Sequence, residues 1–144
     1  MKPWLSVFAS ILTLSTILVL RADTDAEVRA RKDALELAGA FANDGFKIRD
    51  GHLCGVLKPH EHALIALNLY AGNQYWFSVG TVEPVKKAAI SVFDETGKQV
   101  TTESYSNEEK AAAGFVPESS GQYFVAIDLV EGQEGSFCLV YSYI

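Results

Sequence analysis

The stretch "ALIALNLYAGNQYWFSVG" at residues 63–80 decides the fold, because it holds two apolar runs separated by a short turn. Alternate positions of both runs are apolar: Ile65, Leu67 and Leu69 in the first, and Tyr75, Phe77 and Val79 in the second. A period of two indicates β-strands whose alternate side chains face a core. The Gly and Asn between the runs favour a turn. The stretch therefore predicts a pair of strands.

The same period continues along the rest of the chain. Turn sequences rich in Gly, Asn, Asp, Ser and Pro interrupt it at short intervals, and no helical pattern intervenes. Further inward-facing rows contain Ile90, Val92, Tyr123, Val125, Ile127 and Leu129. Seven or eight short strands of this kind predict a β-sandwich or barrel. The candidate strands are 53–57, 63–70, 74–79, 88–93, 99–105, 111–116, 122–129 and 136–143.

Residues 24–43 have a helical pattern and precede the strands. Thr24 or Asp25 can cap the start of this helix, and Gly45 can take the left-handed conformation that follows its end. Because an apolar stripe on a helix needs a surface to pack against, we expect the helix to pack on the sandwich. The stripe contains Ala34, Leu35, Leu37, Ala38 and Phe41.

Several apolar side chains lie on the outer faces of the predicted strands. Trp76 and Phe124 point away from the inward rows, and the last run, "FCLVYSYI" at 137–144, is apolar on both faces. A strand that is apolar on both faces is normally covered on both. We therefore expect Trp76 and Phe124 to lie beneath or beside the helix. The alternative is an open aromatic platform that stacks on a ligand.

The charge of the chain disfavours one class of partner. Its 144 residues carry a formal net charge of −6, with 12 basic and 18 acidic side chains. A protein that binds nucleic acid needs a basic face to neutralise phosphates, and no large basic grouping occurs here. We expect no nucleic-acid partner.

The first residues resemble an export signal. A lysine at position 2 precedes an apolar run at 4–20, which predicts a signal peptide over 1–22 that could be cut as late as residue 26. An uncleaved anchor is the alternative, and it would be the only membrane contact that we expect. The predicted organisation is then a helix at 23–45 and a β-sandwich domain at 46–144, in an exported protein that is periplasmic or secreted.

Cys54 and Cys138 are the only two cysteines of the chain. An exported compartment allows such a pair to oxidise, which predicts a disulfide. Two catalytic or metal-binding thiols are the alternative, but neither cysteine has another one at the spacing of a metal site.

The second half of the sequence resembles the bacterial pre-peptidase C-terminal domain family. The resemblance covers residues 62–143 and lies in three motifs: "LYAGNQYWFSVG", "AAISVFDETGKQV" and "AGFVPESSGQYFVAIDLVEGQEGSFCLVYSY". These are turn and core motifs. The resemblance implies an antiparallel, jelly-roll-like β-sandwich on a secreted protein, and it implies no catalytic activity.

Three histidines form the strongest candidate for catalytic chemistry. His60 and His62 are two residues apart and would share a face of a strand, and His52 lies nearby. A jelly roll with this spacing is similar to the cupin metal site. The residues after His62 supply no further ligand, however, so we expect neither a metal nor another cofactor. A cupin-like metalloenzyme that uses these histidines remains an alternative function.

Exposed aromatic side chains form the candidate ligand surface, because Trp and Tyr combine large apolar area with a polar group. The candidates are Trp76, Tyr105 and Phe124. The sequence predicts a non-catalytic secreted or envelope module that binds a polypeptide or glycan surface through them. A structural accessory subunit of an envelope complex is the other alternative. The oligomeric state stays open.

Overall fold

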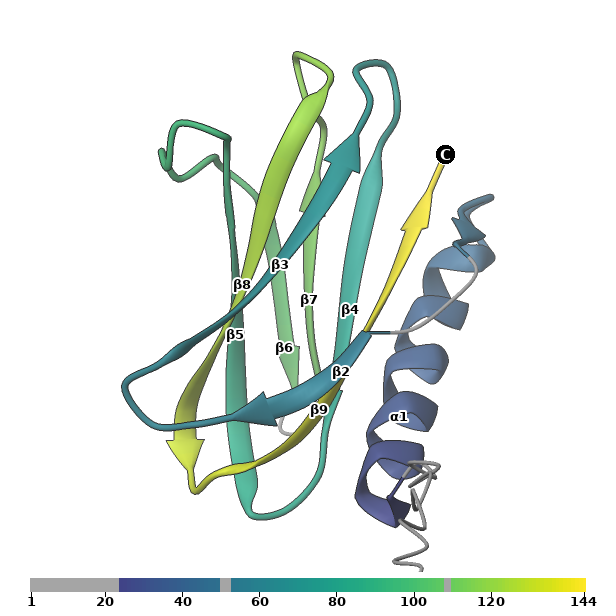
Figure 1. Ribbon diagram of the computed structural model, residues 1–144. Helices are drawn as coiled ribbons and strands as arrows, with labels where there is room; N and C mark the ends of the chain where they lie inside the picture. Colours follow the sequence, from purple (N-terminus) through teal and green to yellow (C-terminus); the bar gives the residue numbers. More distant parts are fainter. Residues whose placement is uncertain (1–23, 50–52, 108–109) are drawn as a thin grey trace, which may run out of the picture.

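The computed structural model describes residues 24–49, 53–107 and 110–144. Two antiparallel sheets face each other, and one helix lies on the outside of the larger sheet (Figure 1). The predicted β-sandwich with a single helix is thus confirmed. The proposed signal segment, 1–22, and His52 lie outside the described residues. None of the described residues belongs to a helix that is both long and apolar enough to cross a membrane.

The larger sheet has the strand order β1-β9-β4-β7-β6, and β2 also pairs with β9. Its strands are β1 (Lys47–Ile48), β2 (Leu53–Leu57), β4 (Tyr75–Thr81), β6 (Glu103–Asn107), β7 (Lys110–Phe115) and β9 (Gly135–Tyr143). The smaller sheet has the order β3-β8-β5, with β3 (His62–Leu69), β5 (Val85–Phe93) and β8 (Gly121–Gly132).

The sheet topology joins the beginning of the chain to its end. The first long strands, β2 and β3, pair with the last two, β9 and β8, on opposite sides of the sandwich. This wrapping is that of a jelly roll. The structure adds the strand β1, which brings the described strands to nine. The sequence does not predict β1, because two residues are too few to show a period.

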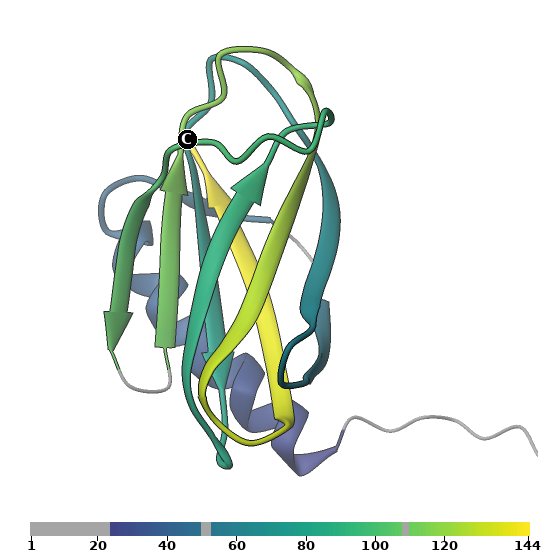
Figure 2. The same cartoon turned by 90° about the vertical axis from the view of Figure 1, so that its left-hand side faces the viewer.

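One predicted strand was placed wrongly. The sequence predicts a strand over 99–105, but β6 begins at Glu103, and Gln99 forms only an isolated bridge with Phe93. The physical reason is that β5 and β6 belong to different sheets, so residues 94–102 have to cross between them (Figure 2).

The core lies between the two sheets. The alternate residues of 63–80 that define the period face it, as do those of β5 and β8, and the largest side chain that is fully buried there is Phe77. The predicted inward rows are therefore confirmed. Phe115 and Tyr123 meet edge to face at 5.2 Å across the core.

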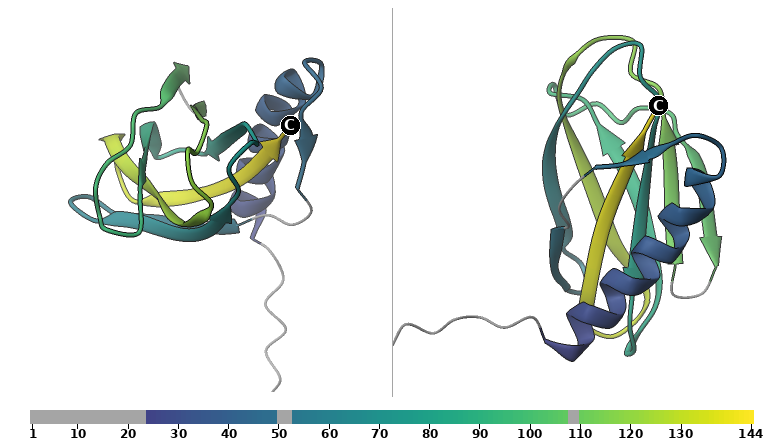
Figure 3. Two further views of the ribbon diagram at one scale, coloured as in Figure 1. Left: turned by 90° about the horizontal axis from the view of Figure 1, so that it is seen from above. Right: turned by 90° about the vertical axis from the view of Figure 1, so that its right-hand side faces the viewer.

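The helix α1 (Asp25–Ala42) lies across β4 and β9 on the outside of the larger sheet (Figure 3). The Oγ1 atom of Thr24 accepts a hydrogen bond from the backbone N–H of Glu27 at 3.2 Å, which confirms the predicted cap. One member of the predicted stripe is wrong. Leu35 is 42% exposed, and Ala30 takes its place in the buried row with Ala34, Leu37 and Ala38.

The disulfide between Cys54 and Cys138 is formed, as the sequence predicts. The two residues are direct partners in the pairing of β2 with β9. They pack with Ala26 and Ala30 near the start of the helix. Strand β9 therefore contributes to the core with one face and to the helix contact with the other, which explains why it is apolar on both.

Candidate functional site

The three predicted ligand-surface residues lie on two different faces of the molecule. In the larger sheet, Trp76 and Glu103 both pair with Gly114, and directly paired residues point to the same face of a sheet. Tyr105 is two residues beyond Glu103 on the same strand, so it shares that face. This is the outer face, which carries the helix. Phe124 lies in β8 of the other sheet. The expectation that Phe124 lies near the helix is therefore wrong.

Trp76 has no ring face available for a ligand. Its indole stacks on Phe41 of the helix, with ring centroids 4.2 Å apart and planes 9° from parallel. Its other face lies over Gly114, where a Cβ atom would come within 2.9 Å of the ring. The indole is thus held between the helix and the sheet. The prediction that it lies beneath the helix is confirmed, and the stacking-platform alternative fails for this residue.

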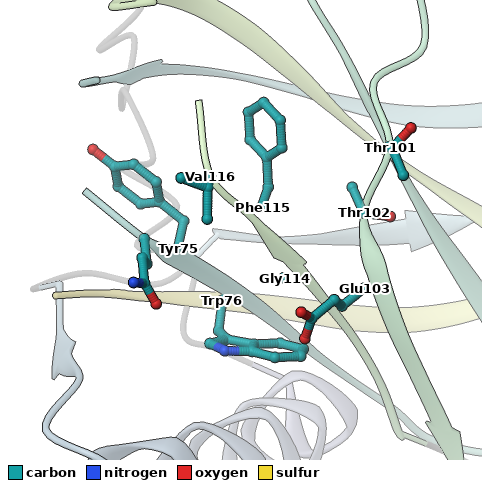
Figure 4. Close-up of a pocket in the computed structure, with 9 residues that line it drawn as sticks. Tyr75, Trp76, Thr101, Thr102, Glu103, Gly114, Phe115 and Val116 are labelled. Carbon is teal, nitrogen blue, oxygen red and sulfur yellow. The ribbon is translucent and has the colours of Figure 1, made fainter. Parts of the chain in front are cut away.

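A hollow of about 280 Å³ remains at the edge of the indole (Figure 4). One side is apolar and contains the edge of Trp76 and Val116, whereas the ring of Phe115 points away from it into the core. Polar side chains form the other side, and the Glu103 carboxylate lies beside the six-membered ring of the indole. The remaining polar residues of the wall are Gln74, Thr101 and Thr102.

Tyr105 lies on β6, an edge strand whose side chains are all exposed. The side chain itself is 45% exposed. It is therefore accessible, but it is not part of the hollow beside Trp76.

The outer face of the smaller sheet carries the second candidate surface. Leu64 is 61% exposed there, and Ala66 is also exposed. Phe124 pairs with both Ala66 and Phe93, so the two phenylalanines are neighbours on this face. A hollow of about 380 Å³ opens between Leu64, Phe93, Phe124, Gly97 and His62. No helix or strand of the described chain covers it (Figures 1 and 2).

The predicted histidine set is only partly visible. His62 Nδ1 pairs with Asp128 Oδ1 on the neighbouring strand β8, and both belong to the outer face of the smaller sheet. His60 lies in the turn before β3 with a φ of 64°. Within the described ranges, no three His, Cys, Asp or Glu side chains come together as a metal site.

Asp94 stabilises the turn that follows β5. Its Oδ1 atom accepts hydrogen bonds from the Thr96 hydroxyl at 2.6 Å and the backbone N–H of Lys98 at 3.0 Å, and these lower the pKa of the carboxyl group. The backbone N–H of Thr96 also donates to it, and Gly97 has a φ of +85°. Asp94 is therefore a structural residue of this turn.

Comparisons with known proteins add no further constraint. The chain matches no protein-family model and no curated protein sequence. The resemblance to the pre-peptidase C-terminal domain family therefore stays a prediction, and the function has to be argued from the two surfaces.

Proposed function

We propose that this protein is a non-catalytic binding module of the cell envelope or the secreted proteome. Its ligand is an amphipathic helix of a partner polypeptide, held on the outer face of the smaller sheet. The observation that supports the proposal is the apolar hollow between Leu64, Phe93 and Phe124 on a face that no described element covers. Contiguous exposed apolar surface of this kind is typical of interaction sites.

The chemistry of the hollow favours a polypeptide over a glycan. Its wall contains two phenylalanines, a leucine and a glycine, and the His62 ring, already paired with Asp128, is its polar side chain. A sugar bound there would lose water from its hydroxyl groups without gaining hydrogen bonds, which costs free energy. Apolar side chains have no such cost and gain from burial.

A helix is the form of polypeptide that suits this face. The backbone groups of a sheet lie in its plane, so an occupant of its outer face has to satisfy its own backbone hydrogen bonds. A helix does so internally and presents one apolar stripe. The other sheet of this same protein is covered in this way by α1. A partner helix would complete the molecule as a second outer layer.

The disulfide supports the proposed setting. A bond between Cys54 and Cys138 is compatible with an oxidising compartment outside the cytoplasm. Export itself, like the binding activity, is part of the proposal.

Site-specific photo-crosslinking in the producing cells tests the proposal. A photoreactive amino acid replaces Leu64 on the uncovered face, and in the matched control it replaces Leu35, an exposed leucine on the outer side of α1. We expect a discrete adduct from position 64 alone, mapped by mass spectrometry to an amphipathic helical segment. The corresponding synthetic peptide should then bind the purified protein, with at least about tenfold loss for Leu64→Asn.

Three results would contradict the proposal. One is the absence of a discrete adduct at position 64, and another is an equal adduct at position 35. The third is an adduct composed of two copies of this chain, which would identify the face as a self-association surface.

A further inference from the structure

The hollow beside Trp76 is a second, chemically different site, and the inference drawn from it does not rest on the proposed function. We propose that it binds an alkylammonium or guanidinium group on an apolar stem, such as the side chain of a lysine or arginine. Four features of the hollow support this ligand class: its size, its two-sided lining, its rigidity and its charge.

The size of the hollow limits what it can hold. Its volume of about 280 Å³ lies just below the range for small-molecule sites, about 300 to 1,000 Å³. It therefore accepts one side chain or one small amine. A nucleotide, an oligosaccharide or a folded segment does not fit inside.

The lining changes from apolar to polar across the hollow. The indole edge of Trp76 and the side chain of Val116 offer contacts for methylene groups. Glu103 provides a carboxylate beside the six-membered ring of the indole, with Thr101 and Gln74 as further polar groups of the wall. Long basic side chains have the complementary composition, since an apolar stem ends in a group that only donates hydrogen bonds.

The apolar side of the hollow is already rigid before a ligand arrives. Trp76 is fixed between Phe41 and Gly114, so its edge cannot move aside without breaking the aromatic stack. A site whose parts are held in place loses little conformational entropy on binding. The stack thus contributes to the site through the position of the indole edge, although both ring faces are covered.

Charge favours a cation over a neutral group of the same shape. A glutamate carboxylate is negative at neutral pH, and the chain as a whole carries a formal charge of −6. A hydrogen bond between a carboxylate and a cation is about twice as strong as one between neutral groups. The net charge also attracts cationic ligands to the surface.

Nuclear magnetic resonance titration of the ¹⁵N-labelled full chain tests the inference. The reporters are the indole N–H of Trp76, distinguished from that of Trp4 by the Trp4→Phe variant, and the side-chain amide of Gln74. The probes are Nα-acetyl-lysine N-methylamide, n-butylamine, which has the same stem and charge without a backbone, and the uncharged Nα-acetyl-norleucine N-methylamide.

We expect the lysine amide to shift both reporters saturably, with a dissociation constant of about 1 mM, as befits a single small group. Stronger binding of the lysine amide than of n-butylamine assigns the site to polypeptide side chains, and equal binding assigns it to free amines. Glu103→Gln should weaken both cations about tenfold. The matched control Glu134→Gln, an exposed carboxylate in the turn between β8 and β9, should not.

Three outcomes would overturn the inference. They are no saturable shift with either cation, equal shifts with the norleucine amide, and unchanged affinity in Glu103→Gln. None of the probes is a helix, and none of the reporters lies on the smaller sheet. A negative titration would therefore leave the proposed function intact, and a negative crosslinking experiment would leave this inference intact.

Discussion

The outer faces of the two sheets differ in the size of their side chains. On the larger sheet, Gly80 meets Ala30 and Ala34 of the helix, and small residues on both sides let the two backbones approach closely. On the smaller sheet, Leu64 and the two phenylalanines stand around a hollow that no described element fills. The face that the chain's own helix covers thus combines small residues with a single tryptophan that stacks on the helix, whereas the open face presents a group of large residues with no such partner.

The largest expected effect concerns the disulfide beneath the helix. Cys54 and Cys138 are separated by 84 positions, and the loop-entropy treatment assigns about 4.5 kcal/mol of stability to a cross-link of that span. The double variant Cys54→Ala/Cys138→Ala should therefore lose most of this amount in urea unfolding. The wild-type chain under reducing conditions is the control and should unfold at the same midpoint. A midpoint that is unaffected by reduction would contradict the prediction.

The second prediction disrupts the close approach on the covered face. A Cβ atom at Gly80 would lie 2.2 Å from the carbonyl oxygen of Ala30, a backbone atom that cannot rotate away. Gly80→Val should cost about 3 kcal/mol of unfolding free energy, because the helix has to move outward.

A second glycine supplies the matched control. Gly39 lies within α1, and a Cβ there would meet nothing within 4 Å. Gly39→Ala should stabilise the chain by about 0.5 to 1 kcal/mol through helix propensity. Equal destabilisation by Gly80→Val and Gly39→Ala would mean that close packing of the helix does not distinguish the two positions.

The third prediction makes the same substitution on both faces. Leu37 of α1 is 9% exposed and Leu64 of β3 is 61% exposed. Leu37→Ala should cost about 2 kcal/mol because a buried side chain leaves a cavity. Leu64→Ala should cost less than about 1 kcal/mol, since little of that side chain is buried. Thermal and urea unfolding measure both, and similar losses would show that the smaller sheet is also covered in solution.

The fold could be predicted from the sequence because its signals are local. Alternating apolar residues identified the core rows of the strands, and a Thr followed by acidic residues located the start of the helix. Phe124 was placed wrongly for a physical reason. Alternation shows that a residue faces away from the core, but it does not show to which of the two sheets its strand belongs. That depends on pairings between distant strands, such as β3 with β8.

The candidate sites were less predictable than the fold. Glu103 lies on the same face as Trp76 only because residues 94–102 cross from one sheet to the other, a path without a sequence period. Leu64 could have been found, since it is an apolar residue on the outer side of its strand. Leu64 and Phe124 together indicate an open apolar face only when it is known that their strands, β3 and β8, pair in the same sheet.

The fourth prediction concerns two hydroxyl groups on the covered face. Among the described residues, Ser78 Oγ and Ser142 Oγ are buried side-chain atoms without a hydrogen-bond partner. Leaving such a group buried costs free energy, so Ser78→Ala and Ser142→Ala should each stabilise the chain by about 1 kcal/mol. Unfolding free energies that fall would show that these hydroxyls have partners in solution, such as ordered water.

The smallest expected effect comes from an ion pair at the rim of the covered face. Lys110 Nζ of β7 lies 3.0 Å from Glu36 Oε2 of the helix. The hydrogen bond from Lys110, together with its charge, lowers the pKa of Glu36 below the ordinary 4.5. The same bond raises the pKa of Lys110 above 10.5. Because both groups are largely accessible to solvent, the contribution to stability is small and is screened by salt.

The directions of the two shifts fix the pH dependence of this contact. The depressed pKa of Glu36 means that its contribution is present above pH 4.5 and is lost as the pH falls through the folded-state value. The raised pKa of Lys110 means that its contribution is present below pH 10.5 and is lost as the pH rises through the folded-state value. A double-mutant cycle of Glu36→Gln and Lys110→Met should therefore show a small favourable coupling at neutral pH. The coupling should shrink at about pH 3 and in high salt. A coupling that persists under both conditions would mean that the two side chains hold the helix by packing and not by charge.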